Sequence, residues 1–132
     1  MTLYLLDTNI LIDLAGAKRS RPFFDGILGA SPFRLATHIL CVAEFYAGGK
    51  EREVKFLEEW VRQDGLEIIY LDSLQDAAKA GRLRKKNALT IADALILSST
   101  ARIRGHLLTH DADLLKKAKQ LLEVSDPLQE DS

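Results

Sequence analysis

Residues 3–14 read "LYLLDTNILIDL", an apolar run interrupted by Asp7, Thr8 and Asn9. The part before Asp7 is short and apolar, as in a buried strand, and residues 10–17 have the pattern of a helix. Thr8 or Asn9 is suited to cap that helix, so Asp7 is expected at the carboxyl end of the strand. Burying an unpaired carboxylate is costly, and the presence of Asp7 at this position therefore needs an explanation.

Further helices and strands are expected to alternate along the chain. After a strand over 2–6 and the helix over 10–17, we expect a helix over 20–29, a strand over 33–37, helices over 38–49 and 51–65, a strand over 66–71, helices over 73–86 and 90–105, a strand over 106–109, a helix over 111–120 and a strand over 121–124. This alternation predicts an α/β fold with a parallel sheet covered on both faces, whose ligands bind beyond the carboxyl ends of the strands.

Composition narrows the class of protein. The 132 residues fit one domain, which we expect over 1–124 with a short tail over 125–132. The single cysteine, Cys41, excludes an internal disulfide and suits a reducing compartment such as the cytoplasm. Polar residues interrupt the first apolar run and no basic segment precedes it, so we expect neither a signal peptide nor a membrane span. The net charge of −1 gives no overall attraction to nucleic acid.

Four acidic residues come from four separate segments: Asp7, Glu44, Asp93 and Asp111. Glu44 is the one charge in "ILCVAEFYA", a helix expected to be mostly buried. Each acid also has an ordinary explanation. Glu44 could pair with an arginine or lie at a rim, Asp93 has capping-box spacing with Thr90, and Asp111 could cap the helix that follows it.

The predicted topology brings at least three of these acids to one edge of the sheet. Carboxylates gathered there would repel one another, and a bound divalent cation would remove the conflict. Ligands that are all oxygen favour Mg²⁺ or Mn²⁺ over zinc. The sequence contains no Cys/His set with zinc-site spacing, no Walker phosphate loop, no GxGxxG turn and no GxSxG elbow.

Four motifs in register, "LDTNILI", "VAEFYAG", "ADALILSST" and "LLTHDADL", resemble those of the PIN-domain nucleases. The likeness is greatest to the small VapC-type toxins of toxin–antitoxin pairs, and it runs from residue 3 to about residue 124. It implies an α/β/α sandwich with a five-stranded parallel sheet in order 3-2-1-4-5. It also implies an acidic pocket that holds Mg²⁺ or Mn²⁺.

The resemblance also assigns roles to individual residues. The four acids of the family, which are catalytic and bind the metal, correspond to Asp7, Glu44, Asp93 and Asp111. Polar residues that would orient the carboxylates or waters correspond to Thr8, Asn9, Thr109 and, as an outer member, Asp113.

The activity that the resemblance implies is divalent-metal-dependent hydrolysis of RNA phosphodiester bonds by an endoribonuclease. The implied partners are the RNA substrate, a small VapB-like antitoxin and a second copy of the chain in a homodimer. Two basic runs could contact RNA, although such runs are often only solvated surface. These are residues 18–21 and a run that contains Arg82, Arg84, Lys85 and Lys86.

Three alternatives remain open at this stage. The chain could be a housekeeping RNA-processing nuclease, or a non-catalytic PIN-like module that binds RNA or protein and uses its acids as helix caps. A receiver-like signalling domain is a third small parallel fold with an acidic pocket. That class needs paired acids after the first strand and a phosphoacceptor after the middle strand; Asp72 fits the second requirement, but Asp7 stands alone.

Overall fold

β1 lies at the centre of a five-stranded parallel sheet in the order β3-β2-β1-β4-β5. The structure is a computed structural model that describes residues 1–30, 32–71 and 73–128. The strands are β1 (Thr2–Leu6), β2 (Phe33–His38), β3 (Glu67–Ile69), β4 (His106–Leu108) and β5 (Val124–Ser125). The predicted sheet and its order are therefore confirmed. A receiver-like fold has the order 2-1-3-4-5, so that alternative is wrong, although Asp72 itself lies outside the described residues.

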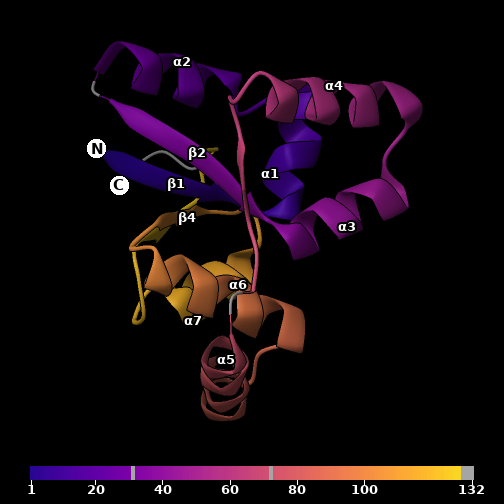
Figure 1. The fold of residues 1–132 in the computed structure, drawn as a ribbon. Coiled ribbons are helices and arrows are strands. Elements are labelled where there is room, and N and C mark those ends of the chain that lie inside the picture. The colour runs from indigo at the N-terminus through magenta and orange to yellow at the C-terminus, as the bar shows by residue number, and fades with distance from the viewer. Residues whose placement is uncertain (31, 72, 129–132) are drawn as a thin grey trace.

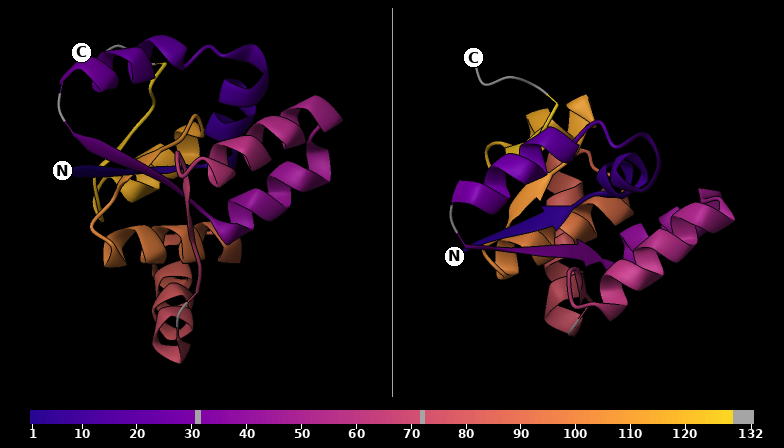
Figure 2. Two further views of the ribbon diagram at one scale, coloured as in Figure 1. Left: turned by 45° about the horizontal axis from the view of Figure 1, so that its top comes forward. Right: turned by 90° about the horizontal axis from the view of Figure 1, so that it is seen from above.

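Helices cover both faces of the sheet, and in Figures 1 and 2 α1, α2 and α4 lie on one side while α6 and α7 lie on the other. The helical segments are α1 (Thr8–Ile12), a π-helical turn η1 (Asp13–Ala17), α2 (Arg21–Ala30), α3 (Ile39–Gly48), α4 (Glu51–Arg62), α5 (Leu74–Asn87), α6 (Ile91–Arg102) and α7 (Ala112–Ala118). α5 packs against α6 and projects from the body of the molecule (Figure 1). None of the described helices is both long and apolar enough to cross a membrane.

The core is formed where the two central strands meet the helices on either side. Leu5 and Leu6 of β1 and Leu107 and Leu108 of β4 are all fully buried. These strands have helices on both faces, which explains why their sequences are apolar without a polar alternation. β1 ends at Leu6, which places Asp7, the residue that follows it, at the carboxyl edge of the sheet.

Several local expectations differ from the structure. Asp7 itself caps α1, because its carboxylate accepts a hydrogen bond from the Thr8 N–H, and the predicted caps Thr8 and Asn9 lie inside the helix. α3 is buried only at Cys41 and Phe45, so one of its sides is exposed although its sequence is apolar.

The last strand and the tail also differ from the expectation. β5 is Val124–Ser125 and not 121–124, because the chain turns back through backbone hydrogen bonds from residues 121 and 122 to Ala118. Of the predicted tail, Ser125 belongs to β5 and Asp126 hydrogen-bonds to His110, while residues 129–132 lie outside the described part of the chain.

Candidate metal centre

Asp7 is a buried carboxylate at the carboxyl end of β1, with 7% of its surface exposed. Its Oδ1 accepts a hydrogen bond from the Thr8 N–H at 2.8 Å, and its Oδ2 accepts one from the Thr109 hydroxyl at 2.7 Å. The Cys41 thiol lies beneath it, with Sγ 3.7 Å from Oδ1. Burial and then the charge of Asp7 raise the pKa of Cys41 to about 12, so the thiol stays protonated and can donate to Asp7.

Thr109 and Asn9 hold this carboxylate in place. The Thr109 hydroxyl is fully buried and accepts hydrogen bonds from Asn9 Nδ2 at 3.2 Å and from the Asp111 N–H at 3.1 Å. Asn9 Oδ1 accepts a hydrogen bond from the His110 N–H at 2.9 Å. Hydrogen bonds through Asn9 and Thr109 therefore connect α1 to the segment after β4 beside Asp7. These are the two polar residues that the sequence motifs place next to the acids.

Glu44 on α3 and Asp93 on α6 are close enough to Asp7 for the three charges to affect one another. Burial is the largest reason for the raised pKa of Glu44, followed by the charge of Asp7, and the charge of Asp93 adds to the rise. Glu44 as a whole residue is exposed, so burial of its carboxylate is only partial, and the neighbouring charges contribute to the rise in its pKa. Burial and the charge of Asp7 likewise raise the pKa of Asp93, and Asp111 contributes to the rise. All four predicted acids thus share one electrostatic environment.

Asp111 also has the ordinary capping role that the sequence allowed, while Asp93 lies in the first turn of a helix that Thr90 caps. Asp111 caps α7, with Oδ1 accepting from the N–H groups of Asp113 at 3.0 Å and of residue 114 at 3.2 Å. The Thr90 hydroxyl accepts from the Asp93 N–H at 3.1 Å. The exposed carboxylate of Asp113 pairs with Lys117 at 2.9 Å and does not contact the other acids. Lys117 also opposes the rise in the pKa of Asp93.

The carboxylate oxygens of Asp7, Glu44 and Asp93 are donors that suit a hard divalent cation, but they do not form a complete coordination sphere. Within the described part of the chain, Asp7, Glu44 and Asp93 form no ion pair with lysine or arginine. The Thr8 hydroxyl oxygen is buried beside Glu44 and Cys41, and hydrogen bonding from it opposes the rise in the pKa of both groups. No three Asp, Glu, His or Cys side chains of the described residues converge closely enough to hold an ion directly. An ion here would bind in part through water, as Mg²⁺ commonly does.

A second polar network, which sequence reasoning missed, lies behind the site. His110 Nε2 lies 3.1 Å from Asp13 Oδ2, and Nδ1 lies 2.6 Å from Asp126 Oδ1. Burial alone would raise the pKa of Asp13, but hydrogen bonds from Ser20, the Arg19 N–H and His110 lower it. Ser20 is 3.5 Å from His110, yet it is fully buried and donates to Asp13 at 2.6 Å. Ser20 is therefore not a nucleophile.

The predicted basic residues are distributed over two places. Arg82, Arg84, Lys85 and Lys86 are all exposed near the end of α5, and we call them the α5 basic cluster. Lys117 Nζ donates to the carbonyl oxygen of residue 88 at 2.9 Å, which ties the end of α5 to α7 beside Asp93. The run over 18–21 instead lies near Asp13, where Arg19 is 3.7 Å from its carboxylate.

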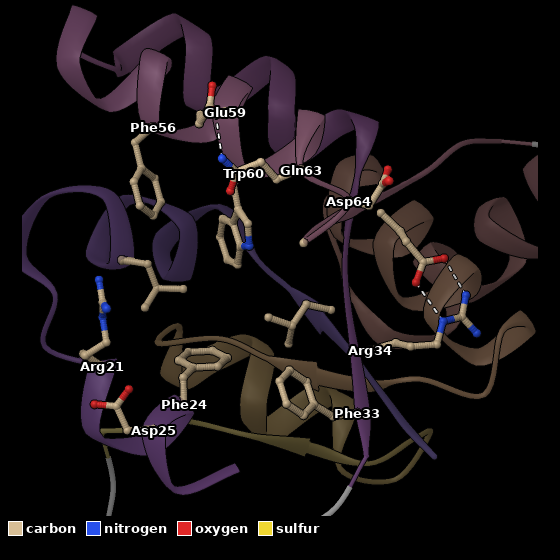
Figure 3. A pocket seen from close by; sticks show the side chains of 14 residues that line it. Arg21, Phe24, Asp25, Phe33, Arg34, Phe56, Glu59, Trp60, Gln63 and Asp64 are labelled. Carbon is tan, nitrogen blue, oxygen red and sulfur yellow. Dashed lines mark hydrogen bonds and ion pairs between the residues drawn. The ribbon is translucent and has the colours of Figure 1, made fainter. Parts of the chain in front are cut away.

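A groove of about 680 Å³ lies between α2, α4 and the strands β2 and β3, and the described residues that line it do not include the four acids (Figure 3). Phe24, Phe56 and Trp60 point into it in Figure 3, and the ring centroids of Phe56 and Trp60 are 5.6 Å apart. An ion pair between Arg34 and Glu67 lies at one side. The groove is thus aromatic within and charged at its margin.

Comparison with protein families gives a match to the PIN domain over residues 4–120, which is most of the chain and includes all four acids. The chain belongs to the PIN domain family. As a family, PIN domains are generally nucleases that use divalent metal ions. No curated protein matches this PIN domain.

Several solved structures similar to this PIN domain are of toxin–antitoxin or VapBC complexes. A toxin–antitoxin complex from Klebsiella pneumoniae is 27% identical, with 94% of this chain and 97% of that chain covered and a TM-score of 0.70. VapBC2 from Rickettsia felis, bound to a DNA fragment from its promoter, is 22% identical, with 95% and 98% covered and a TM-score of 0.72. DNA-bound VapBC from Salmonella typhimurium is 20% identical, with 96% and 99% covered and a TM-score of 0.74.

Proposed function

We propose that this PIN domain is a Mg²⁺- or Mn²⁺-dependent endoribonuclease and the toxin of a VapBC-type toxin–antitoxin pair. The observation that carries the proposal is that Asp7, Glu44 and Asp93 lie near enough for their charges to act on one another, without basic ion-pair partners among the described residues. Burial and then the charge of Asp7 raise the pKa of both Glu44 and Asp93. An acidic cluster of this kind costs stability until a cation neutralises it. Such a cost is typical of a functional site.

Asp7, Glu44 and Asp93 would hold the ion, directly or through water, and Asp111 would complete the pocket. A bound divalent ion lowers the pKa of water and neutralises charge on the phosphate. Thr109 and Asn9 keep the Asp7 carboxylate oriented through the hydrogen bonds described above. The Thr8 hydroxyl lies beside Glu44, and hydrogen bonding from it opposes the rise in the pKa of that carboxyl. Residues that orient metal ligands in this way strongly affect affinity and activity.

The RNA backbone needs positive charge near an acidic pocket, and the α5 basic cluster supplies it. The connection through Lys117 places the end of α5 near Asp93. The cluster is exposed on a helix that projects from the body, so an RNA strand can reach it (Figure 1). We propose that the cluster binds the phosphates of an RNA strand whose scissile bond lies at the acids. We further propose that the protein acts in the cytoplasm.

The proposed partners are an antitoxin and a second copy of the chain. The toxin–antitoxin complexes among the similar structures support an antitoxin partner. The groove lined by Phe24, Phe56 and Trp60 suits an apolar segment of such a partner. The exposed side of α3, which includes Tyr46, suits a homodimer contact.

The proposal is tested by cleavage of a defined RNA panel with the wild type, Asp7→Asn and Asp93→Asn, with and without Mn²⁺. We expect the wild type to cut RNA only with the ion, and EDTA or either substitution to stop cleavage. Equal cleavage by wild type and Asp7→Asn would exclude this site. Absence of both cleavage and Mn²⁺ binding would favour the non-catalytic binding module.

A housekeeping RNA-processing role would use the same chemistry on a different RNA. An upstream reading frame for a small DNA-binding protein would favour the toxin, and its co-purification with this chain and inhibition of cleavage would separate the two roles.

A further inference from the structure

His38 joins the two helices that carry neighbouring acids. It is the last residue of β2, and its side chain is fully buried. Nδ1 accepts a hydrogen bond from the Leu40 N–H at 3.0 Å and so caps α3, the helix of Glu44. Nε2 lies 3.2 Å from Ser99 Oγ on α6, the helix of Asp93. One imidazole ring therefore links the start of α3 to α6.

The hydrogen bonds require one protonation state of the ring. Because Nδ1 accepts from a backbone N–H, it carries no proton, and the ring proton lies on Nε2, which donates to Ser99. A second proton on Nδ1 would place two N–H groups against each other and remove the cap.

The surroundings of the ring also favour the neutral form. Burial is the largest cause of the lowered pKa of His38, and the charge of Arg102 on α6 lowers it further. Arg102 pairs with Asp76 of α5 at 3.3 Å. β3 places the apolar Ile69 beside His38, and the buried thiol of Cys41 on α3 stays protonated.

We propose that neutral His38 is a positioning residue that fixes α3 to α6, and thereby Glu44 to Asp93, and that protonation of its ring loosens this spacing. The part of the inference that concerns metal binding rests on the proposed function. The part that concerns the spacing of the helices does not.

Three substitutions separate the two bonds of the ring. His38→Asn places an oxygen near the position of Nδ1, so it keeps the cap but cannot reach Ser99. His38→Gln can reach Ser99 but loses the cap. Ser99→Ala removes one hydroxyl and is the decisive variant if a His38 variant does not fold. The matched control is His106→Gln, because His106 also bonds a serine, Ser125 at 2.8 Å, but lies on β4.

The spacing is measured in the metal-free protein by electron resonance between spin labels at Tyr46→Cys on α3 and Ile91→Cys on α6, both exposed positions. We expect one narrow distance distribution at about pH 7.5, unchanged in His106→Gln and broadened in the other three variants. At about pH 4, well below the range of an ordinary histidine because burial lowers the pKa of His38, the wild-type distribution broadens and that of His38→Asn does not change further. Identical distributions in all proteins at both pH values would overturn the proposal.

Mn²⁺ affinity, measured by titration calorimetry near neutral pH, tests the link to the site. We expect an affinity about tenfold weaker in the His38 and Ser99 variants and unchanged in His106→Gln, as for other groups that orient metal ligands. If the distances change while the affinity does not, a role of His38 in setting the acids is overturned. If the wild type binds no Mn²⁺, the proposed function fails, and the spin-label distances alone decide the role of His38.

Discussion

Thr109→Val should reduce the stability of the protein by removing one buried hydroxyl while leaving the shape of the core almost unchanged. The Thr109 hydroxyl donates to Asp7 Oδ2 at 2.7 Å and accepts from Asn9 and from the Asp111 N–H. Valine has nearly the same shape but leaves these three groups one partner short. A hydrogen bond to a charged group contributes about 1.5–3 kcal/mol, and a neutral one about 1 kcal/mol. We expect the free energy of unfolding to fall by about 3 kcal/mol, since part of the loss is regained through water.

The assay is urea denaturation of metal-free protein with two controls. Thr109→Ser keeps the hydroxyl and loses one methyl group, which costs about 1 kcal/mol. Thr100→Val removes another fully buried hydroxyl, which donates at 2.7 Å to the neutral Ile96 carbonyl, and should cost about 1 kcal/mol or less. If Thr109→Val costs no more than Thr100→Val, the hydroxyl does not hold Asp7 and the reasoning is refuted. Mn²⁺-dependent cleavage should fall about 10- to 100-fold in Thr109→Val and remain in Thr109→Ser.

Three further predictions concern protons, the second network and RNA. Because the folded pKa values of Glu44 and Asp93 are raised, the folded protein takes up protons at these groups before the unfolded chain does, so they stabilise the metal-free protein as pH falls from neutral. The thermal shift produced by Mn²⁺ should shrink over the same range, and a constant shift down to about pH 4 would contradict this. His110→Leu removes the bonds to both Asp13 and Asp126 and should cost about 3 kcal/mol in urea; a cost under about 1 kcal/mol would show that the network is dispensable. Neutralising the α5 basic cluster should weaken RNA binding and flatten its salt dependence, and an unchanged slope would remove the cluster from the RNA site.

Local patterns predicted the sheet, and the motifs indicated Asn9 and Thr109 beside Asp7, but neither predicted the contacts of His38 and His110. The place of Asp7 follows from a short apolar strand and the polar residues directly after it. His38 and Ser99 lie 61 residues apart, and His110 and Asp13 lie 97 apart. Nothing in one sequence indicates that such residues will meet, because each has an ordinary local use as a cap or surface group.

The burial of α3 was predicted wrongly for a different reason. The segment has few charges, and an apolar helix is usually covered on all sides. In the structure only Cys41 and Phe45 are buried, and Tyr46 is 46% exposed. The composition of a helix shows how apolar it is, but it does not show which helices and strands will pack against it.

The bond between Thr109 and Asp7 closes a loop of 102 residues. Asp7 is therefore synthesised long before Thr109, whose hydroxyl holds its carboxylate. Nascent fragments that end before β4 therefore lack this bond, and the carboxylate of Asp7 gains its support only late in synthesis.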